Sequence, residues 1–169
     1  FLDDWLYKLT TLKIGGVATA ATLIPAIADR CAHVTMLQRS PTFFITGRNA
    51  NELADTLRQL DIPAEWTHEI VRRKVLFDQA AFTRRCVAEP EVVRKELLAG
   101  VRAALGPGHE ADVAQHFNPS YRPWQQRIAF VPDADLFKCV REGKASVVTD
   151  QLESFEPQGI RLQSGQLLE

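Results

Sequence analysis

Arg39 and Ser40 are the two adjacent residues of this sequence best suited to hold an anion. An arginine guanidinium forks onto two phosphate oxygens, and a serine hydroxyl can donate a further hydrogen bond. The two residues follow the apolar run His33–Leu37, where enzymes that select NAD carry an acidic residue for the ribose 2′-hydroxyl. A cation at this place suits the 2′-phosphate, so the segment favours NADP(H). An ordinary surface arginine is the alternative interpretation of Arg39.

A Gly-Gly turn lies upstream, in the run Gly15-Gly16-Val17-Ala18-Thr19-Ala20. Dinucleotide-binding turns follow G-x-G-x-x-A, in which glycines let the backbone approach a pyrophosphate at the N-terminus of a helix. Gly15 and Ala20 fit this pattern, and Val17 stands where the second glycine belongs. A strand-to-helix turn without a ligand is the alternative. The expected cofactor-binding residues are Gly15, Gly16, Ala18, Thr19, Ala20, Arg39 and Ser40.

These residues need two strands and a helix to position them. Hydrophobic periodicity predicts a strand at Leu9–Ile14, in which Lys13 breaks the apolar run, and a second strand at His33–Leu37. Between them it predicts a helix at about Ala18–Ala28 that bends near Pro25. This order of elements is a βαβ unit, which builds parallel sheets.

The rest of the chain is predicted to hold three further helices and then to return to strands. Helical periodicity marks residues 51–60, 70–86 and 91–105, separated by Pro and Gly breakers. Extended segments follow at 127–131, 145–148, 152–155 and 160–163, with a helix at 134–142 and a hairpin between the last two strands. We expect an α/β fold, a Rossmann-like NADP-binding domain with a three-helix insertion and a β-hairpin extension. Residues 1–48 and 118–169 would form the domain and residues 49–117 the insertion.

The composition is that of a globular protein with no bias towards a polyanion. Its 169 residues carry 20 Lys plus Arg and 21 Asp plus Glu, a formal charge of −1, which gives no field that would attract nucleic acid. The longest apolar stretch, 18–28, is too short to span a bilayer, and the three cysteines suit neither a disulfide framework nor zinc. The four histidines are scattered along the sequence, so we expect solvated or capping roles and no metal site. We expect a cytoplasmic protein without nucleic-acid or membrane partners.

Two blocks of the sequence resemble class B flavoprotein monooxygenases of the Baeyer-Villiger and flavin-containing monooxygenase types. The first is A-T-A-A-T-L at 18–23 followed by H-V-T-M-L-Q-R-S-P-T at 33–42. The second runs from His116 to Phe137 and continues with Lys144–Asp150. The resemblance covers most of residues 17–165 and matches the NADPH-binding domain of that family. It implies NADP(H) and FAD as cofactors and the transfer of one oxygen to a ketone or a heteroatom of a small-molecule substrate.

The resemblance also implies a catalytic role for Arg127. By motif position Arg127 is the arginine that reaches the flavin, where a cation stabilises negative charge that develops in the transition state. A structural ion pair is the alternative interpretation of Arg127. Gln126 stands where the family often has a lysine for the cofactor phosphate, and Tyr121 and Trp124 are expected to pack rather than to bind.

Two motifs of the family do not occur in this sequence. They are the FAD-binding turn G-x-G-x-x-G and the block F-x-G-x-x-x-H-x-x-x-W. We therefore expect the FAD-binding segments to be missing from this chain. The competing hypothesis is a catalytically silent nucleotide-binding or protein-interaction module, in which Val17 blocks the pyrophosphate.

Overall fold

A computed structural model describes residues 17–169, with side chains from Thr19 onwards. The strand expected at Leu9–Ile14 and the glycines Gly15 and Gly16 lie outside the described residues. In chain order the elements are α2 (Val17–Ile27), η1 (Ala28–Arg30), β1 (Val34–Gln38), β2 (Phe44–Gly47), α3 (Glu52–Gln59), α4 (Ala64–Ala88), α5 (Pro90–Leu105), α6 (Glu110–His116), β3 (Ala129–Pro132), α7 (Asp135–Arg141), β4 (Ala145–Thr149), β5 (Leu152–Glu156), β6 (Gly159–Leu162) and β7 (Leu167–Leu168).

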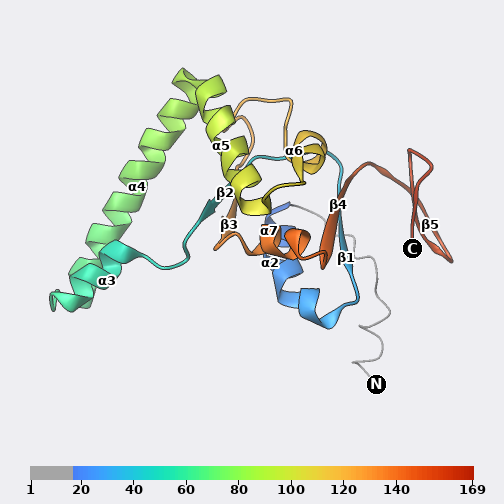
Figure 1. Cartoon of the computed structure of the whole chain (residues 1–169). Helices are drawn as coiled ribbons and strands as arrows, with labels where there is room; N and C mark the ends of the chain where they lie inside the picture. The colour runs from blue at the N-terminus through green and yellow to red at the C-terminus, as the bar shows by residue number, and fades with distance from the viewer. Residues whose placement is uncertain (1–16) are drawn as a thin grey trace.

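Two pairs of parallel strands lie at the centre of the described chain. β1 pairs with β4, from Val34 opposite Ala145 to Gln38 opposite Thr149, and β2 pairs with β3. α2 leads through η1 into β1, so this helix and strand run in opposite directions. The N-terminal end of α2 therefore lies at the same edge as the C-terminal end of β1 (Figure 1). The expected α/β character is confirmed.

A single apolar core joins α2, both parallel strand pairs and the helices α5, α6 and α7. α2 buries Ala20, Ala21 and Ile24 against it, at the spacing of one helix face, and η1 adds Ala28. Small side chains let the helix lie close to the strands, and α2 continues through Pro25 as one helix. This packing fixes the start of α2 relative to the end of β1.

Three phenylalanines lie at the middle of this core. Phe44 of β2, Phe117 after α6 and Phe137 of α7 are each at most 1% exposed. Their rings meet edge to face, with centroids 5.6 Å apart in the two pairs that include Phe44 and 5.5 Å apart between Phe117 and Phe137. Segments far apart in the sequence are thereby held together.

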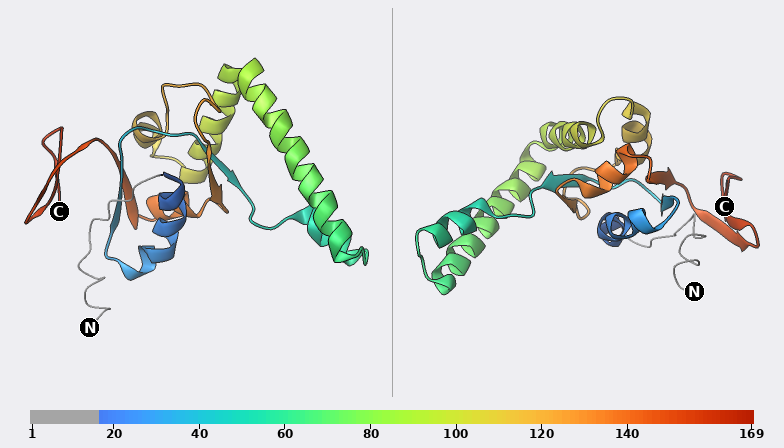
Figure 2. Two further views of the ribbon diagram at one scale, coloured as in Figure 1. Left: turned by 180° about the vertical axis from the view of Figure 1, so that it is seen from behind. Right: turned by 60° about the horizontal axis from the view of Figure 1, so that its bottom comes forward.

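The helices predicted between residues 51 and 105 are present, but they pack in different ways. α5 buries Leu98, Val101 and Leu105 in the main core and packs against β2. α3 and α4 lie side by side and project away from the other elements (Figures 1 and 2). α4 alone has 25 residues, a length of about 38 Å. We call residues 51–88 the arm, and α2, β1 to β4 and α5 to α7 the body.

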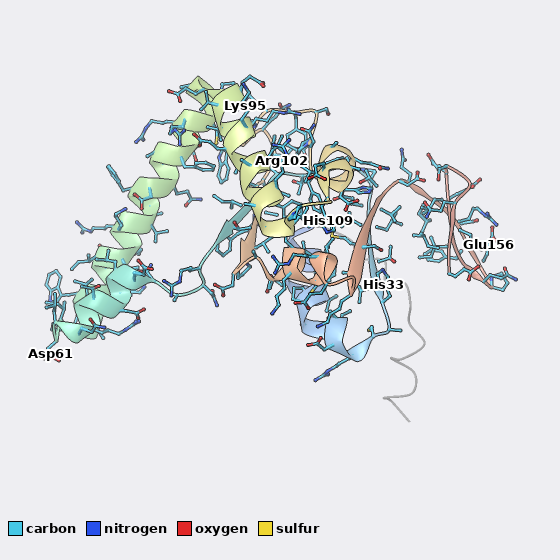
Figure 3. All side chains as sticks on the ribbon, viewed as in Figure 1. His33, Asp61, Lys95, Arg102, His109 and Glu156 are labelled. Carbon is cyan, nitrogen blue, oxygen red and sulfur yellow. The ribbon has the colours of Figure 1, made fainter. Side chains whose placement is uncertain are left out.

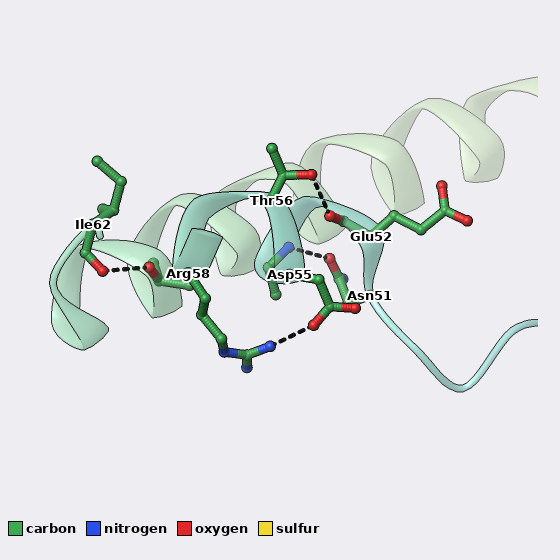
Figure 4. Close-up of polar contacts among 8 residues, drawn as sticks. Asn51, Glu52, Asp55, Thr56, Arg58 and Ile62 are labelled. Atoms are coloured by element: carbon green, nitrogen blue, oxygen red, sulfur yellow. Dashed lines mark hydrogen bonds and ion pairs between the residues drawn. The ribbon is translucent and has the colours of Figure 1, made fainter. Parts of the chain in front are cut away.

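Most of the ion pairs within the arm are short-range. Asn51 caps α3 by accepting a hydrogen bond from the backbone N–H of Ala54, and Arg58 pairs with Asp55 one turn away (Figure 4). On α4, Glu69 accepts hydrogen bonds from Arg72 and Arg73, which lower its pKa to about 2. Asp61 marks the outer tip of the arm (Figure 3).

The C-terminal strands form an antiparallel sheet in the order β5-β6-β7. Gly159 opens β6 with φ +152°, and a Cβ there would lie 2.0 Å from the Leu168 carbonyl oxygen, so only glycine fits. Ile160, Leu162 and Leu168 pack with Leu37 of β1, which ties this sheet to the body. Over residues 17–169, no helix combines the length and apolar character needed to cross a membrane.

Candidate cofactor-binding site

Arg39 and Ser40 are the first two residues after β1, and both are exposed. The Arg39 guanidinium has no ion-pair partner within residues 19–169, where side chains are described. The segment lies at the edge of the body where α2 begins (Figure 1). An unpaired guanidinium at the same edge of the fold as a helix N-terminus is suited to bind a phosphate.

The first turn of α2 is the second part of the candidate site. Thr19 is exposed, and its carbonyl oxygen accepts a hydrogen bond from Thr22 Oγ1 at 3.1 Å. Ala20 is only 1% exposed, so its side chain serves the packing of α2 rather than contact with a ligand. Ala18 lies in α2 without a described side chain, and Gly15 and Gly16 lie outside the described residues. The glycine turn therefore stays a prediction.

A buried polar network holds the end of β1. The Gln38 side-chain amide donates to the His116 carbonyl oxygen at 2.6 Å and to Thr149 Oγ1 at 2.9 Å. Thr149 Oγ1 lies 2.8 Å from His116 Nδ1. The backbone N–H of Asp150 donates to the Gln38 carbonyl oxygen at 2.9 Å. β4 and α6 thus hold the residue that directly precedes Arg39.

The segment that follows Ser40 lies against the segment that carries Arg127. Thr42 Oγ1 is 2.9 Å from the Tyr121 hydroxyl and donates to the Arg127 carbonyl oxygen at 3.4 Å. The N–H of Ala129 donates to the Phe43 carbonyl oxygen at 2.8 Å. The two sequence blocks that carry the family resemblance are therefore neighbours in the fold.

Arg127 is exposed just before β3, and its guanidinium makes no ion pair within the described part of the chain. The contacts therefore do not support a structural ion pair for this residue. Tyr121 and Trp124 pack as expected, Tyr121 on Phe43 with centroids 5.6 Å apart and Trp124 on Phe82 at 6.4 Å.

Three histidines that are far apart in the sequence share one cavity. His33, His109 and His116 line it together with Asp112 and Ser146, around a volume of about 280 Å³. The expectation of solvated or capping histidines was wrong for His116, which is 8% exposed and whose pKa is lowered by burial. The spacing of apolar residues along α6 is the sequence signal that could have predicted the burial of His116. Across residues 17–169, no cluster of His, Cys, Asp or Glu has the arrangement needed to hold a metal ion.

A larger groove of about 820 Å³ lies between α3 and α4 of the arm. Apolar and polar side chains line it in equal number, and it contains none of the residues that the sequence motifs single out. The described candidate cofactor residues, Ala18, Thr19, Ala20, Arg39 and Ser40, lie in or directly next to elements of the body.

Comparison with known proteins gives relatives of a single kind. No protein-family model matches the chain. It is 44% identical over 156 residues to the FAD-containing monooxygenase EthA of Mycobacterium tuberculosis, covering 92% of this chain and 31% of that protein. It is 41% identical over 167 residues to the probable FAD-binding monooxygenase AlmA of Acinetobacter baylyi, covering 98% and 32%. The chain thus spans about a third of the length of these curated relatives.

Solved structures show the same fold at low sequence identity. An oxidized steroid monooxygenase bound to NADP superimposes with a TM-score of 0.63 at 15% identity, over 94% of this chain and 36% of that chain. A cyclohexanone monooxygenase with bound ε-caprolactone gives a TM-score of 0.58 at 14% identity, over 94% and 38%. The resemblance indicated by the two sequence blocks is confirmed, and the chain is homologous to a region that makes up about a third of the FAD-containing monooxygenases.

Proposed function

We propose that this chain is the NADPH-binding portion of an FAD-dependent monooxygenase that, when complete, inserts oxygen into ketones or oxidises heteroatoms. The observation that carries the proposal is the exposed, unpaired guanidinium of Arg39 at the end of β1, in a segment 37–42 that contains no carboxylate. An acidic residue there would repel a 2′-phosphate, whereas a cation binds it. The proposal includes the detailed fold predicted from the sequence. This is a Rossmann-like domain at 1–48 and 118–169, with an insertion at 49–117 and a hairpin extension.

Each candidate residue has a distinct role in this proposal. The turn Gly15-Gly16 and the first residues of α2, Ala18, Thr19 and Ala20, would carry the pyrophosphate at the helix N-terminus. Arg39 and Ser40 would hold the adenosine 2′-phosphate. Gln126 stands where the family often has a lysine for the cofactor phosphate. In this chain the phosphate would therefore be bound mainly by Arg39.

Arg127 would act at the flavin rather than at the nicotinamide cofactor. FAD, bound by segments that the longer relatives contain, would supply the oxygen-transfer chemistry after reduction by NADPH. The exposed cation of Arg127 would then stabilise the negative charge that develops there. We expect the small-molecule substrate to lie between this portion and those segments, and the protein to work in the cytoplasm.

Calorimetric titration of the purified chain with NADPH and NADH tests the proposal. We expect NADPH to bind more tightly, and Arg39→Ala to weaken NADPH by roughly 10- to 100-fold while leaving NADH nearly unchanged, because hydrogen bonds to charged groups contribute about 1.5 to 3 kcal/mol. Arg102→Ala, which removes another exposed arginine of the body, is the matched control and should change neither affinity. Absence of NADPH binding, or equal losses for both nucleotides in Arg39→Ala, would contradict the proposal.

A further inference from the structure

We infer that Gln38, Thr149 and His116 are positioning residues that hold the Arg39–Ser40 turn in place for the 2′-phosphate, and that they add to the preference for NADPH without touching the cofactor. The inference rests on the proposed function. It is carried by the geometry of the buried network at the end of β1.

The direction of each hydrogen bond in the network follows from counting donors. The Gln38 amide nitrogen has two hydrogens, one for the His116 carbonyl oxygen and one for Thr149 Oγ1. The Thr149 hydroxyl is then free to donate to His116 Nδ1, 2.8 Å away. This arrangement needs a neutral His116 with its proton on Nε2, which agrees with the lowered pKa that burial gives this imidazole.

The network lies where three element ends meet. Gln38 and Thr149 are the last residues of β1 and β4 and are directly opposite in the parallel register, so their side chains lie on the same face. His116 is the last residue of α6. The Gln38 carbonyl, which belongs to the peptide group leading into Arg39, is also held, by the N–H of Asp150. Both the side chain and the main chain immediately before the turn are therefore fixed.

Burying this polar network costs desolvation free energy, which apolar side chains would avoid if packing were the only requirement. Gln38 is 5% exposed and His116 is 8% exposed, and Gln38 Oε1 has no hydrogen-bond partner within the described part of the chain. An apolar side chain at position 38 would avoid that desolvation cost, as the neighbouring Leu37 does. Directional bonds differ from apolar packing in fixing orientation, and orientation is what a bidentate arginine contact needs.

The consequence is specific to one nucleotide. The contact that distinguishes NADPH from NADH is made by Arg39 and Ser40, while the pyrophosphate common to both would be held by α2. If the end of β1 is less rigidly held, the affinity for NADPH should therefore fall more than the affinity for NADH. Simple destabilisation of the fold would weaken both nucleotides alike.

The test compares two substitutions of one residue, Thr149→Val and Thr149→Ser, by titration with NADPH and NADH. Valine keeps the volume and removes the hydroxyl, whereas serine keeps the hydroxyl. We expect Thr149→Val to raise the NADPH dissociation constant about fivefold, the equivalent of one net hydrogen bond, with less than about a twofold change for NADH. Thr149→Ser should restore the wild-type ratio of the two constants to within about twofold.

An unchanged ratio in Thr149→Val, or an equal loss for both nucleotides, would overturn the inference while leaving the proposed function standing. Absence of NADPH binding by the wild-type chain would remove the proposed function and this inference together. If Thr149→Val does not fold, His116→Phe takes its place, because it keeps the backbone carbonyl and the ring volume and removes the Nδ1 acceptor. The same selective loss of NADPH is expected, and an unchanged ratio in that variant would equally overturn the inference.

Discussion

The body and the arm of this molecule are stabilised in opposite ways. In the body, side chains from distant parts of the sequence bury one another, as Phe44, Phe117 and Phe137 do. In the arm, most of the ion pairs join residues three or four positions apart, and large apolar side chains such as Trp66 and Phe77 are exposed. Long-range packing therefore fixes the geometry of the body, whereas the helices of the arm depend mostly on local interactions.

The arginines of the two regions show what this difference means for binding. In the arm, Arg58 pairs with Asp55, and Arg72 and Arg73 both pair with Glu69. In the body, Arg39 and Arg127 have no carboxylate partner among the described residues, and they lie just outside the strands β1 and β3. The adjacent basic residues of α4, Arg72-Arg73-Lys74 and Arg84-Arg85, would point to the arm as the anion site, whereas the ion pairs that Arg72 and Arg73 make point to the body.

Loss of a core aromatic should produce the largest difference between the regions. Phe137→Ala removes a fully buried ring that meets two others, and we expect it to lower the free energy of unfolding by about 3 to 5 kcal/mol. Phe77→Ala, on a ring that is 68% exposed in the arm, is the matched control and should change it by less than about 0.5 kcal/mol. Urea denaturation followed by circular dichroism measures both. Similar losses in the two variants would mean that the arm is as tightly packed as the body.

Acid should affect the body through His116. Burial lowers the pKa of this imidazole below its ordinary 6.5, and Asp112 opposes the shift only in part. The unfolded chain therefore takes up the proton at a higher pH than the native one. The contribution to stability is complete above pH 6.5 and is lost as the pH falls through the native pKa.

Urea unfolding at about pH 7.5 and about pH 5.5 measures this effect, with the lower stability expected at the acidic pH. Because His33, His109 and Asp112 line the same cavity, His116→Phe is the control that isolates the contribution of His116. The variant should lose part of the pH dependence. A pH dependence identical to wild type would show that His116 does not carry it.

The smallest effect is expected for an ion pair of the arm. The pKa of Glu69 is lowered from 4.5 to about 2 by Arg72 and Arg73, so its interaction is complete above pH 4.5 and fades as the pH falls towards 2. Solvent and salt screen such an exposed group. Glu69→Gln should therefore leave the unfolding midpoint at neutral pH within error of wild type, in low and in high salt. A clear loss of stability in Glu69→Gln would show that ion pairs stabilise the arm more than we expect, and would contradict this prediction.

Much of the body could be predicted because its elements carry local signals. The apolar face of α2 and the buried run of β1 were visible in the periodicity, and the structure places them at Val17–Ile27 and Val34–Gln38. The position of Arg39 and Ser40 directly after β1 followed from that strand. Local pattern is sufficient where one element alone determines the place of a residue.

The rest depends on contacts that a local pattern does not contain. β2, at Phe44–Gly47, was missed because four residues give too short a pattern, and it becomes a strand by pairing with β3 far along the chain. α4 begins at Ala64 rather than at residue 70. Pro63, directly before it, is a helix-start signal, whereas the amphipathic pattern of α4 is too weak to mark its first turns. The link from Gln38 to Thr149 and His116 joins three segments of the sequence and is visible only in the fold.

Titration of the ¹⁵N-labelled chain with adenosine 2′,5′-bisphosphate and with adenosine 5′-monophosphate tests the central claim most directly, since the two ligands differ only in the 2′-phosphate. We predict that the bisphosphate shifts the backbone amide signals of Arg39 and Ser40, that the monophosphate leaves them nearly unchanged, and that neither ligand moves signals from the groove between α3 and α4. Signals that shift in the arm groove instead, or equal responses of Arg39 to both ligands, would contradict the account.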